Sequence, residues 1–348
     1  MACGGGGGSS STAAVSGDTP AVAQTNYNGP GSKWDFELSS DGTFAFERRN
    51  RPGSPVTMAV DGDYAELDNG FMSLTVTSAT GNNAPDAGDT GWAVEIPGFA
   101  LLLKPTNSDE LIPMVQAGEC PTGDFLANWV SMRSRDGADA TDTTQDYLGT
   151  FAYNAQTQTA TIPGNYALAG NFAPVSSGAL PAGDCQNGIL EVADAAVYLS
   201  NQGSALVHTG LSEPEEASIL FANPPSSIAA MADLDGEYAG VLFNQSPDAN
   251  TAAVVPATVS CNAGLCDVAL LDDVTDTVPA TELDLNLSGT LDWPETGMIT
   301  GEIVDGGDAG AILCTVSSGV GTQESTLMSC VGQVAQDNTK MFNLLIRG

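Results

Sequence analysis

Apolar and polar residues alternate in short segments from about residue 33 onward. Residues 34–38 alternate, 39–42 contain an Asp-Gly turn, and 43–46 return with the same period of two. An Asp-Gly turn between alternating segments is typical of an antiparallel β-hairpin. The same arrangement recurs at 64–76, where Asn69-Gly70 lies in the turn. The pattern therefore predicts a chain that begins its folded part with hairpins.

Turn residues at short, regular spacing separate the segments that follow, as in antiparallel sandwiches and barrels. The further strands predicted before residue 210 lie at 91–103, 111–117, 125–133, 147–153, 157–162, 188–192, 195–200 and 204–209. Helix is scarce. Residues 212–215 read as a capping box, which predicts a short helix over 217–221 that Pro224-Pro225 would end.

The last third of the chain contains a second run of predicted strands, with connections too short for crossover helices. They lie at 236–244, 252–260, 265–271, 281–291, 297–303, 309–316, 324–333 and 339–346. Consecutive strands joined in this way suit an up-and-down barrel or a small sandwich.

These patterns predict an all-β fold with two antiparallel β domains, each a sandwich or a barrel, and a C-terminal barrel of about eight strands. Residues 1–30 are rich in Gly, Ser, Thr and Ala, which is the composition of a flexible tether. The predicted domain limits are 1–30 for the tether, 31–225 for the N-terminal β domain and 226–348 for the C-terminal barrel.

The charge of the chain excludes some partners. Nine Lys and Arg stand against 43 Asp and Glu, a formal net charge of −34. Such an acidic surface repels nucleic acid and anionic lipid headgroups, so neither is expected as a direct partner. Cations and basic proteins remain compatible with it. No apolar run reaches the ~18 residues of a spanning helix, so membrane attachment would have to be covalent.

The first eleven residues suggest such an attachment. Ala2-Cys3 is followed by five glycines and three serines. This stretch resembles the end of a bacterial lipoprotein signal and the start of the mature chain. The resemblance implies that Cys3 carries diacylglycerol and a further acyl chain such as palmitate. Gly4 in place of an aspartate implies delivery to the outer membrane or cell surface, with the periplasmic side as the alternative.

The start of the C-terminal part carries a second, shorter resemblance. Gly236-x-Tyr238-x-Gly240 is similar to the first strand of small calycin-like and surface-lipoprotein barrels. It implies the same closed fold that the strand pattern predicts there.

The cysteines agree with an oxidising compartment. If Cys3 carries lipid, six of seven remain, an even number suited to three disulfides. Cys261 and Cys266 flank a Gly-containing hairpin loop, and Cys314 and Cys330 lie in adjacent predicted strands. Cys120 and Cys185 are then left for each other.

Three of the nine basic residues, Arg48, Arg49 and Arg51, fall in one predicted loop. On so acidic a protein they would form a local positive site for an anionic ligand or a partner, or they would pair with nearby carboxylates of the same chain. No cofactor and no resident metal are expected. Calcium is the ion that Asp233, Asp235 and Glu237, or Asp305 and Asp308, would suit best, although neither group matches an EF-hand loop.

No catalytic constellation stands out. His208 is the only histidine and alternates with apolar neighbours, which favours a structural role. The sequence therefore predicts a lipid-anchored envelope or surface protein that binds an unknown protein or glycan and has no catalytic residues. The first alternative is an extracellular carbohydrate-active hydrolase with paired carboxylates, for which Trp92 and Glu95 are a candidate ring and acid. The second is a carrier of a small apolar ligand inside the C-terminal barrel.

Overall fold

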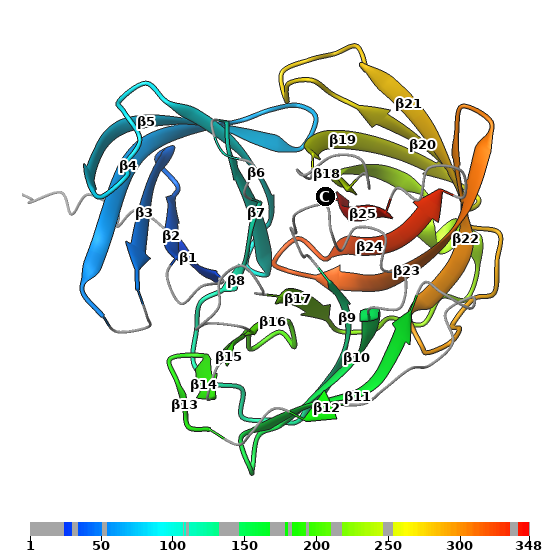
Figure 1. The fold of residues 1–348 in the computed structure, drawn as a ribbon, viewed down its shortest axis with the longest axis horizontal. Coiled ribbons are helices and arrows are strands. Elements are labelled where there is room, and N and C mark those ends of the chain that lie inside the picture. The colour runs from blue at the N-terminus through cyan, green and yellow to red at the C-terminus, as the bar shows by residue number, and fades with distance from the viewer. Residues whose placement is uncertain are drawn as a thin grey trace, which may run out of the picture.

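The computed structural model describes residues 24–29, 34–50, 54–106, 108, 111–131, 146–167, 178–179, 183–192, 195–209, 218–245, 253–334 and 340–347. It contains two closed barrels and a nine-stranded open sheet, so the all-β prediction is confirmed. Figure 1 shows the two barrels side by side, with the open sheet below them, next to the place where they meet. No helix in these ranges is long and apolar enough to cross a membrane.

The first barrel is closed by pairing of its first and last strands, with Tyr27 opposite Gln116. Its strands are β1 (Gln24–Gly29), β2 (Trp34–Ser39), β3 (Thr43–Arg49), β4 (Val56–Glu66), β5 (Phe71–Gly81), β6 (Thr90–Ile96), β7 (Ala100–Pro105) and β8 (Ile112–Gln116). The two hairpins predicted from turn residues are present as β2–β3 and β4–β5. Gly42 and Gly70 take positive φ values of 88° and 85° in these turns, which glycine adopts without strain.

The middle sheet has the strand order β12-β11-β10-β9-β17-β16-β15-β14-β13. Its strands are β9 (Phe125–Ser131), β10 (Asp146–Asn154), β11 (Thr159–Ala167), β12 (Gly178–Ala179), β13 (Cys185–Gln186), β14 (Ile189–Val192), β15 (Ala195–Leu199), β16 (Ala205–Thr209) and β17 (Ser218–Asn223). The helix predicted over 217–221 is wrong, because Ser218–Asn223 pairs as a strand with both β16 and β9. Backbone hydrogen bonds to two neighbours outweigh the local capping pattern.

The second barrel follows the short 3₁₀ helix η3 (Met231–Leu234) and confirms the predicted eight-stranded barrel. Its strands are β18 (Gly236–Gln245), β19 (Ala253–Asn262), β20 (Leu265–Leu270), β21 (Thr281–Asn286), β22 (Met298–Asp305), β23 (Asp308–Val320), β24 (Ser325–Val334) and β25 (Lys340–Arg347). The predicted division near residue 225 falls between β17 and η3. Independent folding of the two parts, which the domain limits imply, stays a prediction.

The largest apolar cluster lies where the three sheets meet. Trp92 and Val94 of the first barrel, Val130 and Phe221 of the middle sheet, and Leu313 of the second barrel all belong to it. Side chains alternate across a strand, so on β6 the intervening Ala93 faces the inside of the first barrel. Burial on both faces explains why 91–103 reads as an apolar run without clear alternation.

Three disulfides join the pairs that the spacing favours. Cys120–Cys185 ties the segment before β9 to β13, at one edge of the middle sheet. Cys261–Cys266 and Cys314–Cys330 each link directly opposite residues of neighbouring strands in the second barrel. All four second-barrel cysteines are buried in its interior cluster.

Candidate functional site

An open cleft of about 570 Å³ lies between the two barrels, where the β4–β5 hairpin meets β18 and β19. The turn of that hairpin is fixed against the second barrel. Asn69 Nδ2 donates a hydrogen bond of 2.7 Å to the Val274 carbonyl oxygen. A Cβ atom on Gly70 would lie only 3.0 Å from Cβ of Ala239, so this turn position has little room for a side chain. The cleft is therefore built from both barrels and depends on their packing.

Carboxylates dominate the polar side chains of the cleft. Among the residues that the structure describes, its lining contains Glu66, Asp68, Glu95 and Glu237, and no Lys or Arg. Glu66, Asp68 and Glu237 are exposed, and Glu237 accepts a hydrogen bond of 2.7 Å from Ser260 Oγ. Carboxylates gathered in a hollow focus negative potential there. The cleft therefore favours a positively charged ligand.

Glu95 lies deeper than the other three acids. It belongs to β6 and accepts a hydrogen bond from the Tyr27 hydroxyl, which in turn accepts one of 3.2 Å from the Gly98 amide. Burial raises the pKa of the Glu95 carboxyl, the Tyr27 hydrogen bond opposes this rise, and the charge of Glu66 adds to it. Burial and the neighbouring Glu95 also raise the pKa of Tyr27. Glu95 thus takes up a proton more readily than an ordinary glutamate.

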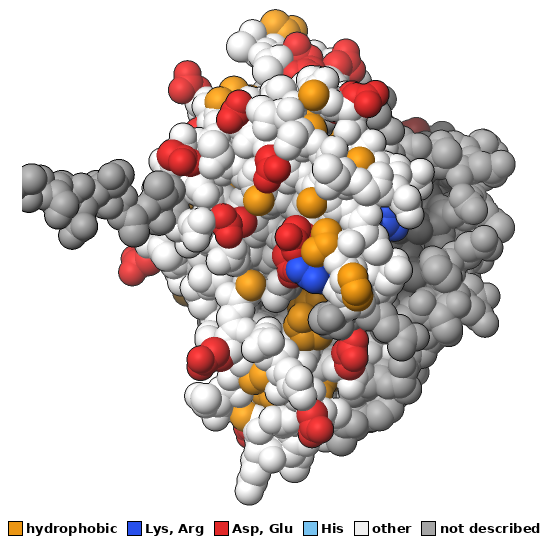
Figure 2. All heavy atoms as spheres, turned by 90° about the vertical axis from the view of Figure 1, so that its left-hand side faces the viewer, with side chains coloured by type: hydrophobic (Ala, Val, Ile, Leu, Met, Phe, Trp, Pro, Cys, Tyr) orange, Lys and Arg blue, Asp and Glu red, His pale blue; other side chains and the backbone are white. Residues whose placement is uncertain are grey.

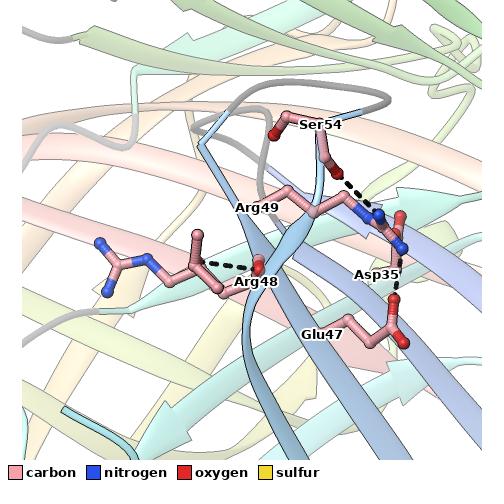
Figure 3. A network of polar contacts seen from close by, with 6 residues as sticks. Asp35, Glu47, Arg48, Arg49 and Ser54 are labelled. Carbon is pink, nitrogen blue, oxygen red and sulfur yellow. Dashed lines mark hydrogen bonds and ion pairs between the residues drawn. The ribbon is translucent and has the colours of Figure 1, made fainter. Parts of the chain in front are cut away.

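The candidate basic site is divided between two faces of β3, as Figure 3 shows. Arg49 Nε lies 3.1 Å from Asp35 Oδ2, and its Nη2 lies 2.5 Å from Glu47 Oε2. Arg49 also donates a hydrogen bond of 2.8 Å to the Ser54 carbonyl oxygen. The Arg48 side chain points away from this group. Arg51 lies outside the described residues.

Two of the acids considered for calcium accept hydrogen bonds from backbone amides. Asp233 Oδ2 accepts hydrogen bonds of 2.9 Å from the amides of Ala229 and Ala230, and Asp235 accepts one from the Ala263 amide. Asp308 is at the β22–β23 turn, and the side chain of Asp305 is outside the described set. Over the described ranges, no three His, Cys, Asp or Glu side chains are placed to hold one metal ion.

The ring and acid proposed for carbohydrate chemistry do not face each other. Trp92 packs edge-on against Phe71 in the three-sheet junction, at 5.7 Å between ring centroids. Glu95 lies on the other face of β6 from Trp92 and points toward Tyr27, inside the first barrel. The backbone of His208 pairs with Ala196 and Ile219 within the middle sheet. Cys3 lies outside the described residues.

The interior of the second barrel is occupied by packed side chains as far as the structure describes it. Leu234, Tyr238, Leu285 and Ile303 belong to its buried cluster, together with the two disulfides. A cavity is found instead in the first barrel, at the end away from the cleft.

Most of this geometry was not visible in the sequence. The one signal was Glu95, an isolated acid in the apolar run 91–103, and isolated acids in buried strands are rare. Glu66 gave no signal, and Glu237 was grouped only with Asp233 and Asp235 as a calcium candidate, because the proximity of Glu66 and Glu237 depends on how the two barrels pack.

The distribution of charge over the surface agrees with the composition. Figure 2 shows the side of the molecule formed by the first barrel, where acidic side chains are scattered and basic ones are few. Net charge therefore does not distinguish the cleft, and its concave shape is what sets it apart.

Comparison with known proteins gives structural likeness only. No family model and no curated protein sequence matches the chain. Solved structures of transferrin binding protein B are similar to it. That of Neisseria meningitidis has 12% identity and a TM-score of 0.30, with 90% of this chain and 65% of that one covered. A double mutant from Haemophilus parasuis has 10% identity and a TM-score of 0.32, with 91% and 66% covered. The chain thus spans less than two thirds of those proteins.

Proposed function

We propose that this chain is a lipid-anchored binding protein of the bacterial cell envelope or surface, which captures a basic protein segment in the cleft between its barrels and catalyses no reaction. The observation that carries the proposal is the cleft itself, with three exposed carboxylates and a half-buried fourth. Charge complementarity of this kind speeds association and selects basic partners over acidic ones.

The size and spacing of the cleft favour a peptide segment over a single ion. Its acids come from β4, the β4–β5 turn, β6 and β18, and they are not grouped to coordinate one metal. Separate carboxylates can each pair with a different Lys or Arg side chain of an extended segment. A volume of about 570 Å³ also exceeds what one cation needs.

Neutralising two acids of the cleft is expected to weaken binding of a basic peptide. The double variant Asp68→Asn/Glu237→Gln should bind a fluorescent hexa-arginine peptide roughly 5- to 30-fold more weakly, because each exposed ion pair contributes about 0.5 to 1 kcal/mol. Fluorescence anisotropy at about 0.15 M salt measures the dissociation constant.

The matched control removes the same charge elsewhere. Asp284→Asn/Glu302→Gln alters exposed acids on β21 and β22, which do not line the cleft. This variant is expected to bind within about twofold of the unaltered chain. If both double variants weaken binding equally, the peptide responds to net charge and the cleft is not the binding site.

The lipid anchor has a separate test. Seven cysteines less the six in disulfides leave Cys3 as the acceptor. Bacteria that express the chain behind a lipoprotein signal peptide and grow with labelled palmitate should label the unaltered chain but not Cys3→Ala. Equal labelling of both, or of neither, would refute the anchor and leave the cleft proposal intact.

A further inference from the structure

The end of the first barrel away from the cleft contains a cavity of about 290 Å³. Its walls are inward-facing side chains, among them Phe36, Phe44, Phe46, Met58, Leu74 and Leu103. The inward positions of β6 at this end are Gly91 and Ala93, and such small residues leave the centre of the barrel unfilled. The cavity is thus an apolar chamber within a closed sheet.

Arg48 is the basic side chain among the described residues of the chamber's rim. Arg48 alternates with Phe46 and Phe44 along β3, so it faces the same side of the sheet and lines the cavity. Figure 3 shows its guanidinium directed away from the carboxylates that hold Arg49. Lys104 follows the inward-facing Leu103 on β7 and does not line the cavity, and its Nζ donates hydrogen bonds to the carbonyl oxygens of Pro105 and Ser108.

Among the described residues, one acid also lines the rim, and it holds a loop of the chain. Asp89 Oδ2 accepts a hydrogen bond of 2.9 Å from the Asp86 amide within the β5–β6 loop. On a chain with nine basic and 43 acidic residues, a guanidinium at the mouth of an apolar chamber is an uncommon local arrangement.

We infer that this end of the first barrel binds a small amphipathic carboxylate, with its hydrocarbon tail among the phenylalanines and its carboxylate at Arg48. Guanidinium and carboxylate form charge-assisted, often bidentate hydrogen bonds. A volume of about 290 Å³ holds roughly ten non-hydrogen atoms at about 30 Å³ each, which is the size of octanoate. This site is independent of the cleft and of its proposed function.

Isothermal titration calorimetry of the full chain tests the inference by measuring its affinity for hexanoate, octanoate and dodecanoate below their critical micelle concentrations. Affinity should rise roughly fourfold per methylene from hexanoate to octanoate. Dodecanoate should gain less per methylene, because the chamber is then full. Octanol, which lacks the charge, should bind at least tenfold more weakly than octanoate.

Two variants and one matched control locate the site. Arg48→Ala should weaken octanoate binding roughly tenfold or more, while leaving octanol binding unchanged. Val76→Phe places a larger side chain at a partly buried position of the cavity wall and should weaken both ligands. The control is Arg49→Ala, which removes the neighbouring arginine on the opposite face of β3. Its affinity for octanoate should stay within about twofold of that of the unaltered chain.

Three results would overturn the inference. The first is an octanoate dissociation constant above about 10 mM for the unaltered chain. The second is equal weakening by Arg48→Ala and Arg49→Ala, which would indicate surface charge alone. The third is undiminished octanoate binding by a folded Val76→Phe variant, which would place the ligand outside the chamber.

Discussion

Replacing Phe221 with alanine is expected to lower the free energy of unfolding by about 3 to 5 kcal/mol. Phe221 is 1% exposed and lies on β17, directly opposite Leu206 of β16 and Val130 of β9. All three side chains belong to the cluster where the barrels and the middle sheet meet. The truncation would leave a cavity that three separate sheets would have to shift to fill.

Urea denaturation measures this loss, followed by tryptophan fluorescence and by circular dichroism on the same samples. Leu126→Ala is the matched control, because Leu126 lies on neighbouring β9 but is 66% exposed. The control should change the free energy of unfolding by less than about 0.5 kcal/mol. A loss below about 1 kcal/mol for Phe221→Ala would show that the junction is loosely packed and does not hold the three sheets together.

Removing the Cys120–Cys185 disulfide is expected to cost about 4 kcal/mol. The bond spans 65 residues, and in the chain-entropy model a cross-link restricts the unfolded chain more as the loop it closes grows. The same model gives about 2 kcal/mol for Cys261–Cys266, which spans 5 residues. The difference arises from the unfolded chain, because both bonds join segments that already lie side by side in the fold.

Urea denaturation under oxidising conditions measures the free energy of unfolding of the unaltered chain, of Cys120→Ala/Cys185→Ala and of Cys120→Ala alone. The two variants should have free energies of unfolding within about 1 kcal/mol of each other, since the first substitution already removes the cross-link. The urea dependence of the free energy should also steepen, because the unfolded chain then exposes more surface. A cost below about 1 kcal/mol with an unchanged slope would contradict the entropic account.

Local patterns in the sequence predicted the strands well, and the reason is geometric. Alternation with an Asp-Gly or Asn-Gly turn fixes both the pairing and the face of a hairpin, as in β2–β3 and β4–β5. The disulfide pairs could be inferred for a related reason. Cys261 and Cys266 face each other across a short hairpin, and Cys314 and Cys330 across adjacent strands.

The failures concern pairing between distant segments. Residues 24–223 hold a closed barrel and an open sheet. The first strand, Gln24–Gly29, lies in the segment predicted as a tether, and nothing near Tyr27 indicates that it pairs with Gln116. The interpretation of the Arg48 region was incomplete for another reason. The prediction of a loop grouped Arg48 with Arg49. Both residues lie instead on strand β3, which places their side chains on opposite faces, that of Arg48 toward the cavity and that of Arg49 toward Asp35 and Glu47.

The position of β9 in the middle sheet has a consequence for how the chain reaches this fold. One edge of β9 pairs with β10, which follows it, but the other edge waits for β17, which lies far along the chain. Phe125–Ser131 contains no charged residue and no proline, the composition of strands that associate with other chains when an edge is open. During synthesis this edge stays unprotected until Ser218–Asn223 has emerged. The return of β17 to the centre of the sheet therefore protects the nascent chain from aggregation, in addition to completing its architecture.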